Sequence, residues 1–446
     1  MSFQEFLGLA MLVAMMSIIF VGFPIAFTLL SIALVFGAIG LGTELTFSLA
    51  YLQVWGTMKD DILPAVPLFV FMGFMVEQAG LMERLFLALR NLLAALRGSL
   101  FLAVILTATI FAMATGIVGA AVTVLGIMAG PVMLRAGYDH RLSAGAIAAG
   151  GTLGILIPPS IMLVVMGPTI GVPVNYLYAA ALGPGLLLAS LYILYCLGRS
   201  FFNPRLGPPV PKAERVTDVR ELAREFVLGV IPLAALIGFT LGSILGGLAT
   251  PTEAASCGAF GATLLAAAYR KLTWSALRNT ALSTLVTSSM VLFLAVASNV
   301  FGAVFTKLGA TDLISNALMQ VPLPDLGKLL LVMVLIFVLG WPFEWPAIIL
   351  VFLPIFLPVV QQLDLGLDPQ EAMIWFGTLV AVNLQTAFLS PPVAMSAYYL
   401  KNVVPQWGLG TIYRGMGQFM LIQIVCLAAV LLWPSLSLWL PRLMQQ

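Results

Sequence analysis

The chain has 446 residues, of which 61% are hydrophobic and 9% are charged, and its formal net charge is +2. Soluble domains carry roughly 45–50% apolar and about 25% charged residues. This composition therefore excludes an ordinary soluble protein and indicates a polytopic membrane protein. The net charge says little about partners, and no nucleic-acid partner is expected.

The first third of the chain begins with apolar runs long enough to cross a bilayer, which takes about 20 residues. Residues 6–21 and 25–41 are predicted spans, and a polar stretch at 43–62 follows them. Residues 64–80 form a short predicted span. The segment 81–97 mixes leucines with arginines and a glutamate, which predicts an interfacial amphipathic helix.

The next apolar run, 99–135, is longer than one straight span requires. Small residues at 114–119 interrupt its middle, so the run predicts two half-length helices that form a re-entrant hairpin. Residues 141–168 predict a broken span, with interruptions at 150–154 and at Pro158-Pro159.

The rest of the chain predicts four spans and then a second copy of the same pattern. The four spans are 175–198, 226–246, 252–269 and 280–305. In the second copy, the hairpin is 327–362 with its turn at 339–344, the broken span is 370–400 with interruptions at 383–386 and 390–392, and the last span is 415–440.

The two copies align at an offset of roughly 224–233 residues. Gly116 corresponds to Gly340, and Pro158-Pro159 corresponds to Pro391-Pro392. Interrupted hydrophobic segments at matching places in two halves point to a secondary transporter, with its site where the repeats meet.

The basic residues predict the topology, because cytoplasmic loops are enriched in Lys and Arg. If both hairpins return to the side they entered, sixteen basic residues fall on one side and four on the other. The loop 199–225 is then cytoplasmic, the N-terminus is periplasmic, and the two copies have opposite orientation. The expected fold is an all-α membrane protein of inverted repeats, each with a re-entrant hairpin and a broken transmembrane helix.

The predicted breaks are the candidate binding sites. A proline pair frees backbone carbonyls, which persist at membrane depth only inside protein or around a wet cavity. Such carbonyls are hard oxygen ligands for a small cation, and half-helix N-termini favour an anionic solute. An alternative is that the small polar residues only permit close helix packing. The side-chain oxygens at the breaks belong to Thr115, Thr152, Asn383, Gln385, Thr386 and Ser390.

Two glutamates invite different interpretations. Glu344 sits in the second hairpin's turn, where an intramembrane carboxylate is costly and usually functional. Alternatively, it bonds to nearby backbone and holds the turn. Glu253 follows Thr250 at the start of a predicted span, which favours a helix cap.

Motifs of familiar enzymes are missing from the sequence. The only histidine, His140, precedes an arginine, so there is no His-Glu-x-x-His motif, and no Walker A loop is found. We expect a protein that is not an enzyme and that uses an ion gradient or a partner for uphill transport.

Four stretches together resemble the large membrane subunit of tripartite ATP-independent periplasmic (TRAP) transporters. They are residues 62–69, 151–160, 249–255 and 390–392, and the resemblance covers essentially the whole chain. It implies a sodium-driven importer of the elevator type in the bacterial inner membrane. It also implies a small four-span membrane subunit and a periplasmic solute-binding protein that delivers an organic anion, usually a carboxylate. Sodium ions are the implied coupling ions, and no other cofactor is expected.

The resemblance also implies which residues bind sodium or solute. The implied sodium ligands are Thr115, Gly116, Gly151, Thr152, Gly340, Asn383 and Thr386. The wider sodium- or substrate-binding set adds Pro158, Pro159, Glu344, Gln385, Ser390, Pro391 and Pro392. One departure concerns the first hairpin tip, where many members carry a serine-rich turn and this chain has Ala114-Thr115-Gly116-Ile117. Backbone carbonyls would then supply more of the coordination.

The resemblance divides the chain into scaffold and transport parts. The transport domain consists of residues 99–168 and 327–402, and the scaffold is mainly residues 1–98. Connecting spans with the cytoplasmic loop occupy 169–279, and a span with the interfacial arm of the second repeat occupies 280–326. The C-terminal span lies in 403–446. Two alternatives stay open. One is a self-sufficient ion-coupled transporter without a binding protein, and the other is a passive channel or scaffold protein.

Overall fold

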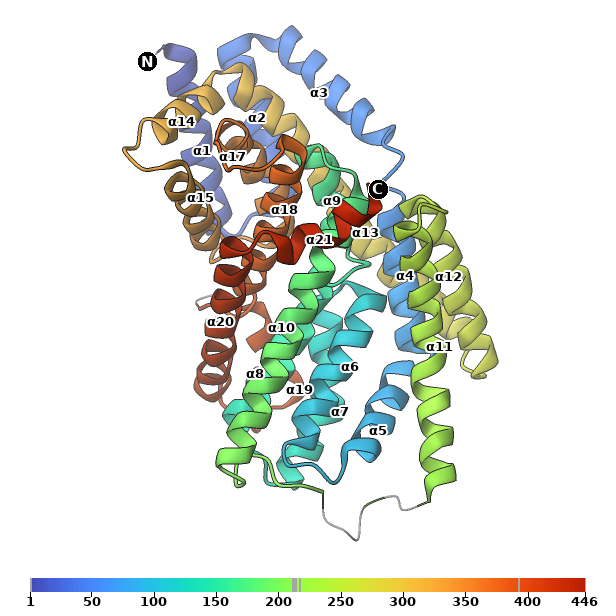
Figure 1. Cartoon of the computed structure of the whole chain (residues 1–446). Coiled ribbons are helices and arrows are strands. Elements are labelled where there is room, and N and C mark those ends of the chain that lie inside the picture. The colour runs from blue at the N-terminus through green and yellow to red at the C-terminus, as the bar shows by residue number, and fades with distance from the viewer. Residues whose placement is uncertain (1, 211–214, 216–217, 392–393, 446) are drawn as a thin grey trace.

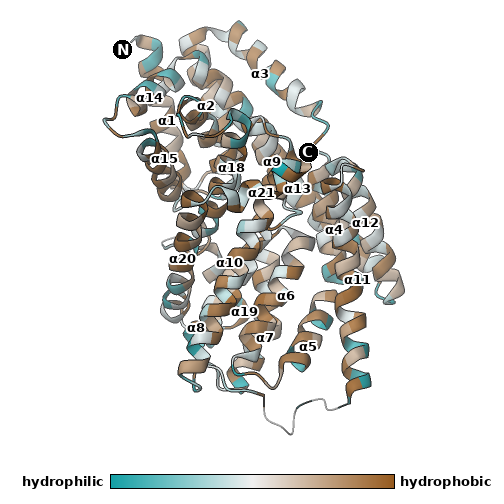
Figure 2. Cartoon of the chain, viewed as in Figure 1, coloured by the Kyte–Doolittle hydropathy of each residue, from teal (hydrophilic) through white to brown (hydrophobic). Residues whose placement is uncertain are grey.

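The computed structural model describes residues 2–210, 215, 218–391 and 394–445, without the side chains of Ala112, Ala114 and Thr115. Within these residues every element of regular secondary structure is a helix (Figure 1). Six helices of the described part are long and apolar enough to cross a membrane, or up to eight if each of two bent helix pairs counts as one span. Hydrophobic residues run along the long helices, while hydrophilic ones gather toward both ends of the molecule (Figure 2). The predicted class of an all-α polytopic membrane protein is confirmed.

One group of helices packs around the long helix α13, whose partners include α2, α3 and α4. The polar stretch that follows the second span is not irregular, because it forms helix α3, which lies across the upper end of the molecule (Figure 1). The members of this group are α1 (Phe3–Val21), α2 (Ile25–Leu41), α3 (Thr43–Met58), α4 (Ala65–Gln78) and α13 (Trp274–Lys307). Two further helices extend it, because α12 (Pro251–Ala268) packs against α4 and α11 (Val219–Leu245) packs against α12.

Two short amphipathic helices connect this group to the hairpins. Helix α5 (Leu81–Leu93) follows α4 after a bend of 59° at Gly80, as the sequence predicts for an interfacial helix. Helix α14 (Ala310–Met319) follows α13 after Gly309, at the matching place in the second copy. The two lie at opposite ends of the molecule, so the inverted relation between the copies is present in the fold (Figure 1).

Both predicted hairpins are present. The first consists of α6 (Ser99–Thr115) and α7 (Val118–Arg135), which meet at a two-residue turn. In the second, α15 (Asp325–Leu339) leads to a turn at 340–344. The returning arm is then built from α16 (Trp345–Ala347), the π-helix η2 (Ile348–Phe352) and α17 (Leu353–Val360).

Each broken span has one interruption and not two. Helices α8 (His140–Leu156) and α9 (Ile161–Ile170) meet at the proline pair with a bend of 43°. Helices α18 (Pro369–Ala387) and α19 (Met395–Val403) flank the second proline pair. The interruptions expected at 150–154 and 383–386 were wrong, since both segments are helical. The glycines at 150–154 serve close packing instead, because a Cβ at Gly151 would lie 3.1 Å from the backbone nitrogen of Val122 in α7.

The last helices of each copy also correspond. Helix α10 (Val174–Phe202) closes the first copy, and α20 (Leu409–Leu432) closes the second. The last span is shorter than expected, because it ends before Pro434 and the chain turns into the separate helix α21 (Ser435–Met444). The guanidinium of Arg442 in α21 binds the Glu371 carboxylate at the start of α18, at 2.6 and 2.7 Å.

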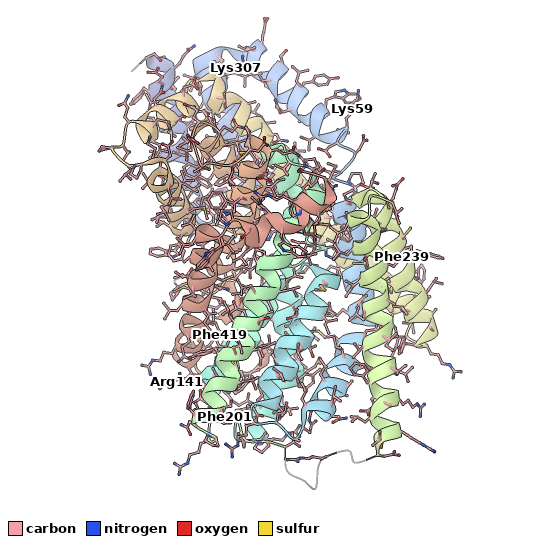
Figure 3. The ribbon with its side chains drawn as sticks, in the orientation of Figure 1. Lys59, Arg141, Phe201, Phe239, Lys307 and Phe419 are labelled. Carbon is pink, nitrogen blue, oxygen red and sulfur yellow. The ribbon has the colours of Figure 1, made fainter. Side chains whose placement is uncertain are left out.

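The distribution of basic side chains agrees with the division used to predict the topology. Figure 3 shows Lys59 and Lys307 at the upper end of the molecule and Arg141 at the lower end. The end of α10 and the start of α11 also lie at the lower end (Figure 1). The lower end is thus the face predicted to be cytoplasmic.

Candidate functional site

The tips of the two hairpins and the two helix breaks face one cavity of about 130 Å³. Helix α13 closes its remaining side. The lining residues are Gly116, Ile117, Val118 and Gly119 from the first hairpin, Glu344, Trp345 and Pro346 from the second, Ile161, Phe388, Met395 and Tyr399 from the broken helices, and Thr287, Met290 and Val291 from α13. The sequence predicted the meeting of tips and breaks, and the fold brings them together.

The first tip rests directly on the first break. Gly116 has φ +60°, a conformation that costs other residues about 1–2 kcal/mol. A Cβ at Gly116 would lie 3.3 Å from the backbone nitrogen of Ile161, the first residue of α9. Only glycine meets both conditions without strain, because it has no side chain. The Ser160 hydroxyl caps α9 by accepting from the Leu163 nitrogen.

The other candidate residues of the first copy lie before and after the contact between Gly116 and Ile161. Thr152 is fully buried in α8, one turn before the break, and its hydroxyl donates to the Ala149 carbonyl at 2.8 Å. Pro158 and Pro159 occupy the break itself. The backbone of Thr115 ends helix α6, and its side chain lies outside the described part of the structure.

The second tip is close to the second break in the same way. A Cβ at Gly340 would lie 2.9 Å from the Cβ of Ala387, the last residue of α18. Glu344 comes immediately before α16, but its carboxylate makes no capping bond there. Its side chain is exposed and lines the cavity. Glu344 therefore does not hold the turn by capping the following helix, and its charge faces the site.

Buried polar atoms without partners gather at the second break. The Asn383 amide donates to the Met333 carbonyl of α15 at 2.8 Å, and the Thr386 hydroxyl donates to the Asn383 carbonyl at 2.6 Å. Asn383 Oδ1, both amide atoms of Gln385 and the Ser390 hydroxyl are buried and have no hydrogen-bond partner within the described residues. Such atoms are costly unless a ligand or water satisfies them. Pro391 is exposed beside them, and Pro392 lies outside the described residues.

Sequence reasoning missed the residues that close the cavity from other helices. Tyr399 of α19 packs over the first hairpin, because a Cβ at Gly119 would lie 3.0 Å from its ring. Its spacing of four from Met395 was the available signal, since both residues then share one helix face. Thr287, Met290 and Val291 come from the middle of α13, and no feature of that span marks them in the sequence.

The chemistry of the site suits a hard cation and an anion side by side. Its inner oxygens are neutral carbonyls, amides and hydroxyls, and Glu344 adds one negative charge. In the described part of the chain, no three His, Cys, Asp or Glu side chains lie close enough together to hold a metal ion. The half-helix α9 begins at the cavity, and its N-terminus offers partial positive charge to an anion.

Comparison with known proteins identifies the family. Residues 12–436 match the family described as tripartite ATP-independent periplasmic transporter, DctM component. The chain is 30% identical over 394 residues to the C4-dicarboxylate TRAP transporter large permease protein DctM of Pseudomonas aeruginosa, covering 88% of each chain. It is 28% identical over 435 residues to the sialic acid TRAP transporter large permease protein SiaM of Vibrio cholerae, covering 96% of this chain and 97% of that protein.

A solved structure has a similar fold. The YdaH transporter of Alcanivorax borkumensis matches with a TM-score of 0.63 at 18% identity, over 92% of this chain and 96% of that one. At this identity the match concerns the fold alone. The family match settles the membership, so the chain belongs to the DctM family of large TRAP transporter permeases. It is a membrane transporter subunit and not an enzyme.

Proposed function

We propose that this large permease subunit imports an organic anion, with a carboxylate as its recognised group, and that an inward sodium gradient drives the import. A periplasmic solute-binding protein delivers the anion, and a small four-span subunit completes the complex in the bacterial inner membrane. The relatives named for C4-dicarboxylate and sialic acid support an acidic solute. The observation that carries the proposal is the cavity between two hairpin tips and two broken helices, together with the unpartnered buried polar atoms at the second break, whose Phe388 lines that cavity.

Sodium binds, in this proposal, where each tip meets its break. In the first half, the backbone of Thr115 and Gly116 and the hydroxyl of Thr152 are the available oxygens near α9. In the second half, the backbone of Gly340 and the side chains of Asn383 and Thr386 serve the same purpose. The unpartnered Asn383 Oδ1 supports this assignment, because a cation would satisfy an acceptor that the protein leaves open. Gly151 contributes by letting α8 approach α7.

The anion binds in the cavity itself, against the N-terminus of α9. The Gln385 amide and the Ser390 hydroxyl lie on either side of Phe388, which lines the cavity, and they support this assignment because they can donate hydrogen bonds and have no partner among the described residues. Glu344 would repel an anion in an empty site, and bound sodium offsets that repulsion. Sodium binding therefore raises the affinity for the anion, which is the coupling that a symporter requires.

The elevator mechanism assigns movement to the hairpins and broken helices. In this proposal α6–α9 and α15–α19 carry the site across the membrane, while α13 and its neighbours stay in place. Thr287, Met290 and Val291 are then the fixed surface past which the tips slide. The support for this division is that the cavity has one wall on α13 and all others on the hairpins and broken helices.

Uptake into proteoliposomes tests the proposal. The chain is reconstituted with its small subunit, and the solute-loaded binding protein is added outside, with and without an inward sodium gradient. Uptake that needs both sodium and the binding protein is the expected result. Sodium-driven uptake without the binding protein would instead indicate a self-sufficient transporter. A leak that no gradient affects would overturn the importer and favour a passive pore.

A further inference from the structure

A second cavity, of about 300 Å³, lies where the amphipathic helix α5 crosses α11. The start of α11, which lines this cavity, lies at the lower end of the molecule, on the face predicted to be cytoplasmic (Figure 1). The cavity is lined by Arg84 and Leu87 from α5 and by Glu221, Arg224, Glu225, Leu228 and Gly229 from α11. We call it the α5–α11 groove. It is separate from the cavity at the hairpin tips.

Two cations in the groove have no acidic partner. Arg84 and Arg224 are both exposed, and neither makes an ion pair within the described residues. Arg84 is nevertheless held in place, because its guanidinium lies 4.7 Å above the ring of Tyr269. The Tyr269 hydroxyl in turn donates to the Leu228 carbonyl of α11. The guanidinium is thus positioned in advance for a ligand.

The two acidic residues of the groove do not neutralise these arginines by contact. Glu225 is occupied, since one carboxylate oxygen accepts a hydrogen bond of 2.7 Å from the Asn91 amide of α5. Glu221 lies one turn before it and lines the same groove. A ligand of this groove needs an anionic group that contacts the arginines. Its affinity is higher if it also carries a hydroxyl or amine that donates a hydrogen bond to Glu221.

Apolar side chains continue from the groove along the surface of α11. Leu87, Leu228 and Ile231 are 46%, 37% and 50% exposed. In a helix that crosses the membrane, such residues face acyl chains. Gly229 allows α5 to lie close to α11, because a Cβ there would be 3.0 Å from the Arg84 carbonyl oxygen. The groove therefore places two arginines without acidic partners beside an apolar surface.

We propose that the α5–α11 groove binds a glycerophospholipid of the cytoplasmic leaflet. The phosphate lies between Arg84 and Arg224, because guanidinium groups bind phosphate oxygens in a bidentate way. Leu87, Leu228 and Ile231 contact an acyl chain. Arginines in pockets between helices on the cytoplasmic side can bind the phosphate of acidic lipid headgroups.

The bound lipid would hold α5, the helix that leads into the first hairpin, against α11. Helix α5 joins α4 to α6, and α6 ends at the tip glycine region. A lipid clamped between α5 and α11 fixes the start of this connection against α11. We therefore expect lipid occupancy to stabilise the α5–α11 packing, whatever solute the protein carries.

Native mass spectrometry of the purified full-length chain tests this proposal. The delipidated protein in detergent is titrated with phosphatidylglycerol. A saturable adduct is expected, and Arg224→Gln should weaken it about tenfold, equal to about 1.4 kcal/mol. Arg224 makes no hydrogen bond or ion pair within the described residues, so its replacement leaves the fold intact. Arg84→Gln, with its loss of the Tyr269 contact, is a second variant with the same expected direction.

The matched control is Arg220→Gln, which removes an equal charge from the exposed first turn of α11 outside the groove. It should bind phosphatidylglycerol like the unmodified chain. Equal weakening by Arg220→Gln and Arg224→Gln would overturn the groove as the site. Equal binding of diacylglycerol, which has no phosphate, would overturn phosphate recognition. Competition by inorganic phosphate at equal concentration would assign the site to a free anion and overturn the lipid.

Discussion

The side-chain amide of Asn383 donates a 2.8 Å hydrogen bond to the main-chain carbonyl of Met333, which joins the helix before the second break to the first arm of the second hairpin. The donor is buried, and the acceptor lies on a different element fifty residues away in the chain. The bond leaves Asn383 Oδ1 without a partner. One side chain thus both fixes the hairpin and offers an oxygen to the site.

Asn383→Leu should lower stability and uptake together. Losing one buried hydrogen bond costs about 1 kcal/mol, and the hairpin arm loses its tie to α18. Thermal unfolding and sodium-driven uptake measure the two effects. The control is Thr378→Val in the same helix, whose hydroxyl donates only to its own helix at Ile374. Loss of uptake in the control but not in Asn383→Leu would contradict the assignment.

Gln385→Met should remove the response to ligand without lowering the stability of the ligand-free protein. The amide is fully buried and unpartnered, so an apolar side chain of similar size relieves a cost of about 1–3 kcal/mol. A ligand at about 100 times its Kd stabilises the unmodified protein by about 2.7 kcal/mol. This stabilisation is measured as the rise in melting temperature when sodium and solute are added. In Gln385→Met we expect most of that rise to disappear.

Gln423→Met is the control for this variant. Gln423 is equally buried and unpartnered, but it lies on α20, whereas Gln385 lies in the last turn of α18 at the second break. Gln423→Met should keep the ligand-induced shift. If both variants respond like the unmodified chain, Gln385 does not bind a ligand.

Gly116→Ala should abolish most uptake. The new methyl group meets the start of α9 at about 3.3 Å while the backbone is held at φ +60°, so strain and contact act together. Gly137→Ala separates the two causes, because Gly137 has φ +72° and open space around its missing Cβ. It should cost about 1–2 kcal/mol in stability and leave uptake near normal. Equal loss of uptake in both variants would assign the effect to backbone strain alone.

The Glu371–Arg442 pair should make stability depend on acid pH. Hydrogen bonds from Arg442 lower the pKa of Glu371 below its ordinary value. A lowered pKa in the folded state contributes stability above the unfolded pKa of about 4.3, and this contribution is lost as pH falls through the folded value. Because the pair is partly exposed, we expect about 0.5–1 kcal/mol.

Melting curves of the unmodified chain and Glu371→Gln between pH 7 and pH 3 measure how much the pair contributes to stability. The difference in melting temperature should be largest at neutral pH and shrink below about pH 4.3. Arg442→Gln should behave in the same way, because it removes the other half of the pair. A difference that stays constant across this range would show that the carboxylate does not act through its charge.

The hairpins and the proline breaks could be predicted because both follow from local rules. A long apolar run with a small-residue centre has to turn, and a proline pair cannot continue a helix. The segments 150–154 and 383–386 were predicted wrongly for a related reason. Glycine and polar residues weaken a helix in isolation, but Gly151 packs against α7 and Asn383 bonds to α15, and these contacts keep both segments helical.

The sequence by itself determined the membrane class, the two inverted copies and the elements that approach the site, because hydrophobic length, proline and basic residues act along the chain. Only the tertiary structure decided which side chains share the cavity. Tyr399 and Thr287 reach it from helices far apart in sequence, and the Asn383–Met333 bond forms only when α15 and α18 are packed. Partners of this kind depend on how helices pack side by side, which no local pattern encodes.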